Sequence, residues 1–74
     1  MIQETLDLRA LDPPEPLLRI LEMVRGDTRG PYVFLLAREP RPLYPLLAAA
    51  GWRHALRIDD RGFEVTVFRD PRIA

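Results

Sequence analysis

Cysteine is absent from the 74 residues of the chain. Without a thiol, the protein can form no disulfide, present no thiolate as a nucleophile or metal ligand, and carry no persulfide sulfur. Every cysteine-dependent reaction is therefore excluded.

An excess of charge of one sign is also lacking, because eleven basic side chains balance eleven acidic ones. A balanced chain has no general attraction for nucleic acid or for an anionic membrane, so we expect neither as a partner. No apolar run approaches the roughly 20 residues of a membrane-spanning helix. Residues 1–5 carry neither the basic nor the apolar region of a signal peptide. These features predict a cytoplasmic protein.

Size and composition favour a single globular domain over residues 1–74. Apolar residues make up 47% of the chain and charged residues 30%, which is typical of a folded domain. A chain this short buries only about 60% of the surface that it exposes when unfolded, so we expect a thin core.

Two helices are predicted, each preceded by prolines and followed by a glycine. Apolar residues recur at helical spacing over residues 17–24, with charged residues on the opposite side. Proline is tolerated in the first turn of a helix, where an amide hydrogen would lack a partner, so this helix starts near Pro16. The second helix is expected from Leu43, with Pro45 in its first turn and Gly51 at its end.

Four strands are predicted from alternation and from apolar runs. Tyr32–Leu36 is apolar at every position, which is typical of a central strand that is covered on both faces. Residues 5–9 alternate and predict a short strand. Residues 52–58 and 63–67 also alternate, and they predict a β-hairpin with a four-residue loop over 59–62.

The element order is β-α-β-α-β-β, which predicts an α/β fold built as a two-layer sandwich. Strands separated by a helix are expected to pair in parallel, and the final hairpin is antiparallel. Two helices on one face of a four-stranded mixed sheet leave the other face partly bare. Phe68 points to that face, so a homodimer or another protein partner is expected to cover part of it. Scattered apolar surface residues, which are ordinary in folded proteins, are the alternative.

Two proline motifs carry a resemblance to a known superfamily. Residues 13–16 (Pro-Pro-Glu-Pro) follow a predicted strand and an Ala-Leu pair, and the segment resembles the opening of the TusA/SirA-like sulfur carriers, whose first helix begins with Cys-Pro-x-Pro. Residues 39–44 (Glu-Pro-Arg-Pro-Leu-Tyr) resemble the acid-proline-basic-proline-leucine motif of a sister group, domain-of-unknown-function family 2249. Many members of that group have a histidine where this chain has Arg38. The resemblance covers nearly the whole chain and implies the TusA-like fold.

The sulfur chemistry of that superfamily does not carry over. The carriers use a thiol at the start of the first helix, where the helix dipole stabilises a charged sulfur. Pro13 occupies the corresponding position here, and its ring can neither ionise nor accept a sulfur atom. The resemblance therefore implies a scaffold without sulfur transfer.

Charged residues near the predicted helix starts are the candidate ligand-binding residues. Cations are disfavoured at the positive end of a helix dipole, so Arg38 and Arg41 beside the second helix raise the hypothesis of a small anion site. Neutralisation of the arginines by Glu39 in weak surface ion pairs is the alternative. Parallel strand-helix units bring both helix starts to one edge. The complete candidate set on that edge is Asp12, Glu15, Arg38, Glu39, Arg41 and Tyr44.

No catalytic or metal-binding constellation is found in the sequence. Helix capping explains Asp12 and Glu15 more simply than acid-base chemistry does. His54 is the only histidine, and its alternation with Trp52 and Leu56 predicts a partly buried structural residue. Further ligands at metal-binding spacing are lacking, so neither a metal nor another cofactor is expected. Whether His54 has a functional role stays open.

These patterns predict a non-catalytic binding or accessory module that engages a protein partner. The alternative is a protein that binds a small anion or a metabolite at the N-terminus of the second helix. An enzyme is the third hypothesis, and no group of residues supports it.

Overall fold

The computed structural model describes residues 5–26 and 30–69. Residues 1–4, on which most of the signal-peptide prediction rests, lie outside the described part. The elements in chain order are β1 (Thr5–Asp7), α1 (Glu15–Gly26), β2 (Tyr32–Leu36), α2 (Leu43–Ala49), β3 (Trp52–Asp59) and β4 (Gly62–Arg69).

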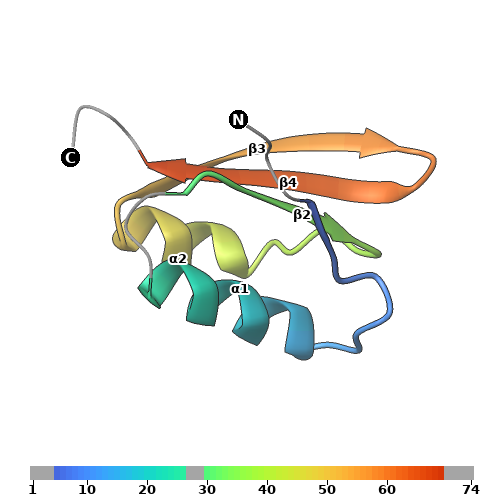
Figure 1. Cartoon of the computed structure of the whole chain (residues 1–74), viewed down its shortest axis with the longest axis horizontal. Coiled ribbons are helices and arrows are strands. Elements are labelled where there is room, and N and C mark those ends of the chain that lie inside the picture. The colour runs from blue at the N-terminus through green and yellow to red at the C-terminus, as the bar shows by residue number, and fades with distance from the viewer. Residues whose placement is uncertain (1–4, 27–29, 70–74) are drawn as a thin grey trace.

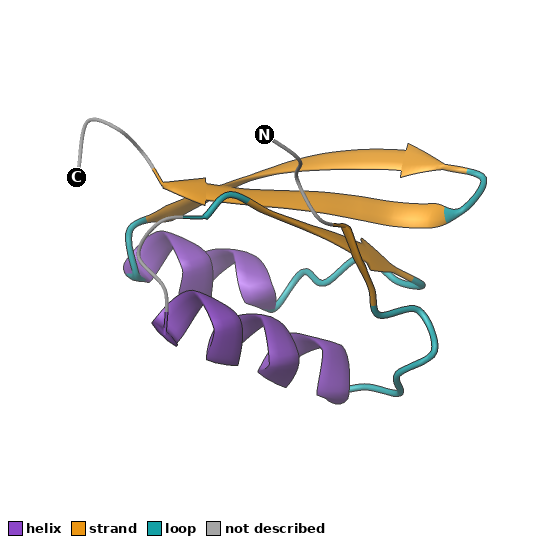
Figure 2. Cartoon of the chain, viewed as in Figure 1, coloured by secondary structure: helices purple, strands orange, loops and turns teal. Residues whose placement is uncertain are grey.

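The molecule has two layers, a four-stranded mixed sheet and two helices that lie on the same face of it (Figures 1 and 2). The strand order is β1-β2-β4-β3. β1 pairs with β2 in parallel, whereas β4 is antiparallel to both β2 and β3. The predicted fold class and element order are therefore confirmed.

The neighbours of β2 differ from the prediction. β2 and β3 were expected to pair in parallel because a helix joins them, but β4 lies between them. β2 and β3 do run in the same direction, since each is antiparallel to β4. The physical reason is the composition of the hairpin. Val65 and Val67 of β4 are completely buried, so β4 takes the inner position and the charged strand β3 takes the edge.

Two element ends also differ from the prediction. The hairpin loop has two residues rather than four, because Asp59 pairs with Gly62 across its base. The Asp59 carboxylate accepts a hydrogen bond of 2.9 Å from the backbone N–H of Arg61, which stabilises the tight turn. β1 ends at Asp7 rather than at Arg9, because the backbone N–H of Arg9 donates to the Asp7 carboxylate.

The core lies between the sheet and the helices. Its completely buried members come from both helices and both inner strands: Ile20, Phe34, Leu36, Leu43, Leu47, Val65 and Val67. Burying one such side chain stabilises the fold by about 1.5–3 kcal/mol. Ile20 and Val24 belong to the predicted apolar stripe of α1, and both are buried.

The opposite face of the sheet is covered in part by its own charged side chains. Leu35 is buried on this face, and the strand register places it between Asp7 and Glu64. Asp7 binds the guanidinium group of Arg9 at 2.7 Å, and Glu64 binds that of Arg61 at 3.2 Å. Arg9 also donates to the backbone carbonyl of Arg61, so the network joins the end of β1 to the hairpin turn. Leu35 therefore needs no partner protein to shield it from water.

Candidate functional site

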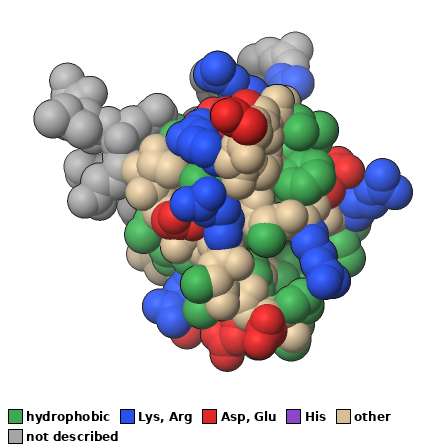
Figure 3. Space-filling model, turned by 90° about the vertical axis from the view of Figure 1, so that its right-hand side faces the viewer, with side chains coloured by type: hydrophobic (Ala, Val, Ile, Leu, Met, Phe, Trp, Pro, Cys, Tyr) green, Lys and Arg blue, Asp and Glu red, His purple; other side chains and the backbone are tan. Residues whose placement is uncertain are grey.

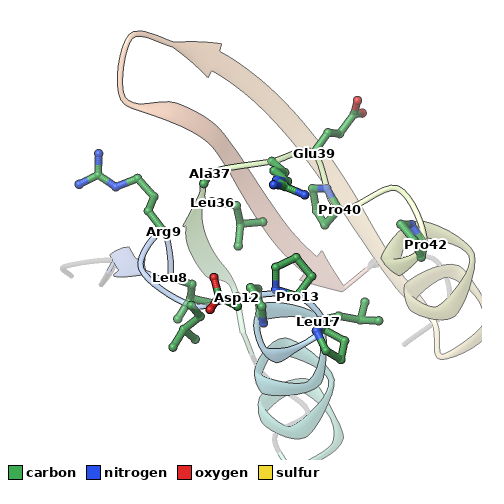
Figure 4. Close-up of a pocket in the computed structure, with 14 residues that line it drawn as sticks. Leu8, Arg9, Asp12, Pro13, Leu17, Leu36, Ala37, Glu39, Pro40 and Pro42 are labelled. Atoms are coloured by element: carbon green, nitrogen blue, oxygen red, sulfur yellow. The ribbon is translucent and has the colours of Figure 1, made fainter.

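A pocket of about 350 Å³ opens between the β1–α1 loop and the β2–α2 loop (Figure 4). Both loops follow the carboxyl ends of the two parallel strands, the edge at which α/β proteins commonly bind ligands. Ten of the fourteen lining residues are apolar: Leu8, Leu11, Pro13, Pro14, Pro16, Leu17, Leu36, Ala37, Pro40 and Pro42. The other four are charged: Arg9, Asp12, Arg38 and Glu39.

Backbone hydrogen bonds and proline rings hold both loops in place. In the first loop, the N–H of Leu11 donates to the Leu8 carbonyl and the N–H of Glu15 to the Asp12 carbonyl. In the second loop, the N–H of Leu43 donates to the Pro40 carbonyl at 2.9 Å. Each proline ring fixes one backbone dihedral, so the pocket walls lose little conformational freedom when a ligand binds.

The charged lining residues form the rim of the pocket, where Arg9, Asp12 and Arg38 are exposed to solvent. Figure 4 shows Pro13 in the β1–α1 loop just before α1, with its ring turned towards Leu36 of β2. The guanidinium group of Arg9 and the carboxylate of Glu39 are directed away from the pocket. The end of the molecule that carries the hairpin turn and the β1–α1 loop has acidic and basic side chains interspersed among apolar ones (Figure 3).

Glu39 contacts two other predicted site residues, Arg41 and Tyr44, which do not line the pocket. Its carboxylate binds the Nε atom of Arg41 at 3.1 Å and accepts a hydrogen bond of 3.3 Å from the Tyr44 hydroxyl. Burial raises the pKa of Tyr44, and the negative charge of Glu39 adds to this effect. The side chain of Arg41 is 82% exposed. Arg41 thus has the acidic neighbour that the alternative interpretation of the sequence expected.

Two charged residues at the pocket rim have no ion-pair partner among residues 5–26 and 30–69. They are Asp12 on the first loop and Arg38 on the second. Asp12 was expected to cap the first helix with its side chain, but its backbone carbonyl accepts the hydrogen bond from Glu15 instead. Its carboxylate is therefore available to a ligand, as is the guanidinium group of Arg38.

The structure thus divides the six predicted site residues into two groups. Asp12, Arg38 and Glu39 line one pocket, whereas Glu15, Arg41 and Tyr44 lie outside its lining. The apolar walls were missed by the sequence interpretation. The one signal that could have found them is the clustering of prolines in both loops at the same sheet edge.

His54 is exposed, and the prediction of a partly buried histidine is wrong. Its ring stacks on that of Tyr44 from α2, with centroids 3.9 Å apart. In β3 only Trp52 is buried, while Leu56 is 36% exposed and Ile58 64% exposed. The alternation identified the side chains that share a face, but α2 has only seven residues and leaves the later part of β3 uncovered.

The part of the chain that the structure describes contains no group of three His, Asp or Glu side chains that could hold a metal ion. Within the same residues, no helix is long and apolar enough to cross a membrane.

Comparison with known proteins adds no relative. No family model, curated protein or solved structure matches the chain. The function must therefore be inferred from the site itself, and the resemblance to the sulfur carriers rests on the two proline motifs.

Proposed function

We propose that this chain is a non-catalytic binding module that takes an apolar side chain of a protein partner into the pocket between the β1–α1 and β2–α2 loops. The observation that carries the proposal is the lining, in which apolar residues outnumber charged ones by ten to four. A few anchor side chains, often aromatic, that are buried in well-packed pockets supply most of the affinity in protein recognition.

The size of the pocket favours a side chain over a cofactor. Its volume of about 350 Å³ lies near the lower end of the roughly 300–1,000 Å³ that small-molecule sites occupy. A single aromatic or branched side chain fits this space. The fixed proline walls reduce the entropy that binding would otherwise cost.

The two opposite charges at the rim favour one orientation of a bound partner segment. Asp12 and Arg38 lie on different loops and have opposite charges. A segment with its apolar anchor between a basic and an acidic residue would complement both. Such pairs at the rim contribute more to specificity than to affinity.

The absence of sulfur chemistry follows from the residue at the first helix. By the resemblance to the TusA-like carriers, Pro13 stands where their thiol stands, and in this chain it forms part of the pocket wall. A carrier scaffold that has lost its nucleophile and kept a pocket at that position is consistent with binding alone. The cytoplasmic location stays a prediction from the sequence.

A second candidate is a small anionic ligand held by Arg38. The observation in its favour is that no carboxylate among the described residues forms an ion pair with this guanidinium group. The predicted anion site beside Arg41 has weaker support, because Glu39 already neutralises that residue.

Selection of random peptides displayed on phage tests the main proposal. Wild-type protein should enrich sequences with one large apolar residue between opposite charges. Ala37→Phe should abolish binding because it fills the pocket from an exposed position, and Ala49→Phe on α2 is the matched control that should bind normally. Failure to enrich a motif, or equal binding to both variants, contradicts the proposal. Thermal stabilisation by phosphate, sulfate or succinate that Arg38→Glu abolishes would instead favour the anionic ligand.

A further inference from the structure

The outer strand β3 has a backbone edge that is unpaired within the described residues. β3 comprises eight residues, Trp52–Asp59, and its only partner there is β4. The opposite edge strand, β1, has three residues. A long edge strand presents a row of N–H and C=O groups to any other strand of suitable sequence. β3 is therefore the part of the sheet that is open to extension.

Apolar side chains follow this edge on the face that carries the helices. Leu56 pairs with the buried Val65 of β4, and Ile58 pairs with Phe63. Leu56 and Ile58 are among the most exposed large apolar residues of the described chain. An added strand would bury them, because residues opposite each other in an antiparallel pair lie side by side on one face.

We propose that β3 pairs with β3 of a second copy of this chain, antiparallel and centred on Leu56. A two-fold axis perpendicular to the sheet relates the copies, so both helical layers stay on the same side. Leu56 then meets its own counterpart, and Ile58 meets His54 of the other copy. Arg57 lies opposite the small side chain of Ala55. The two four-stranded sheets become one continuous sheet.

Charge selects this register over its main competitor. Among the registers that keep the faces aligned, the two that pair the longest part of the strand are centred on Leu56 and on Ala55. The register centred on Leu56 places Asp59, which also binds Arg61 of its own chain at 2.9 Å, opposite Arg53 of the other copy, and the symmetry creates this contact twice. The register centred on Ala55 places Arg53 opposite Arg57, also twice. Like charges in opposed positions destabilise a strand pair, and opposite charges stabilise it.

The inner surface of the proposed contact is already ordered in the single chain. The stack on Tyr44 fixes the His54 ring, at a centroid distance of 3.9 Å. His54 therefore loses little freedom when Ile58 of the other copy packs beside it. The proposal concerns a different surface from the pocket, and neither depends on the other.

Complementary charge reversal tests the register. Wild-type protein should sediment as a dimer, whereas Arg53→Asp and Asp59→Arg should each dimerise roughly tenfold more weakly, because each creates two like-charge contacts. An equimolar mixture of the two variants should restore the dimer, since every contact in the mixed pair joins opposite charges. A size tag on one variant distinguishes the mixed dimer from either homodimer.

The outcomes that overturn the proposal are equally specific. A wild type that stays monomeric at its solubility limit rules out the dimer and leaves the edge to a strand of another protein. Dimers that are insensitive to both variants, or a mixture that stays monomeric, rule out the register. If Asp59→Arg fails to fold because the Arg61 contact is lost, Ile58→Lys tests instead whether the dimer forms through β3. It should yield a monomer, while the matched control Leu18→Lys on α1, at a position 55% exposed, should stay dimeric.

Discussion

The phenol ring of Tyr44 and the imidazole ring of His54 lie in parallel planes, with their centroids 3.9 Å apart. Tyr44 belongs to α2 and His54 to β3. The Tyr44 hydroxyl also donates a hydrogen bond to Glu39 in the preceding loop. One side chain thus joins the edge strand, the short helix and the loop that forms part of the pocket.

A double-mutant cycle on this stack should reveal coupling between the two rings. We expect Tyr44→Leu and His54→Ala to be non-additive in the free energy of unfolding by about 0.5–1.5 kcal/mol, the usual range for aromatic pairs. Urea denaturation of the four proteins measures it. Tyr44→Phe is the control, because it keeps the ring and loses only the hydrogen bond to Glu39. Additivity within about 0.5 kcal/mol would show that the stack does not stabilise the fold.

The hairpin turn should make stability depend on pH in the acidic range. The side-chain hydrogen bond from Arg61 lowers the pKa of Asp59 from 3.8 to about 2, and the backbone N–H of Arg61 adds to the effect. A carboxylate with a depressed folded-state pKa stabilises the protein above the unfolded-state value, and this contribution disappears as the pH falls through the folded-state value. The Asp59 contribution is therefore complete above pH 4 and is lost towards pH 2.

Asp59→Asn should flatten the decline in melting temperature between about pH 4 and pH 2. Asp7, whose pKa Arg9 lowers to about 2 in the same way, should cause part of the decline that remains. The double variant Asp7→Asn with Asp59→Asn should therefore be flatter still. Equal slopes in wild type and Asp59→Asn would contradict the assignment.

The fold class could be predicted because each element carries its own local pattern. The fully apolar run Tyr32–Leu36 predicted an interior strand, and the helical spacing over residues 17–24 predicted the buried stripe of α1; both predictions are confirmed. The neighbour of β2 could not be read in this way, since alternation shows which side chains share a face and not which strand lies beside which. The arginines at positions 53 and 57 were the available clue, because charge is typical of an edge strand.

The pocket was only half predictable. Its rim residue Arg38 stood out, because a cation next to a helix start calls for an explanation, and Asp12 was noted as a helix cap. Its walls did not stand out, because a leucine that lines a pocket and a leucine that fills a core have the same sequence pattern. Leu17 lines the pocket and Ile20 does not, because two loops more than twenty residues apart in the chain meet beside Leu17. The exposure of His54 was missed for a related reason, since alternation shows which side chains share a face and not how much of that face is covered.

Gly62 at the base of the hairpin should tolerate no side chain. Its φ angle is +138°, and a Cβ atom there would lie 2.5 Å from the carbonyl oxygen of Leu36. We expect Gly62→Ala to lower the free energy of unfolding by about 1–3 kcal/mol, measured by urea denaturation. Gly26→Ala is the matched control. No atom lies within 4 Å of the Cβ position at Gly26. We therefore expect Gly26→Ala to raise the free energy of unfolding by at most about 1 kcal/mol. If Gly62→Ala leaves the free energy of unfolding unchanged, β2 and β4 can move apart at this position without cost.

The two arginines beside the second helix should differ in their effect on binding. Arg38 lines the pocket without an ion-pair partner among the described residues, whereas Arg41 is bound to Glu39 and is 82% exposed. We therefore expect Arg38→Glu to weaken binding of a phage-selected peptide several-fold, most strongly at low salt, because a charge at the rim is screened as the salt concentration rises. Arg41→Glu should change affinity less than twofold, because removing a surface ion pair has little effect. Fluorescence anisotropy at two salt concentrations measures both variants. The reverse order of sensitivity would move the site from the pocket to the start of α2, where the sequence pattern alone had placed it.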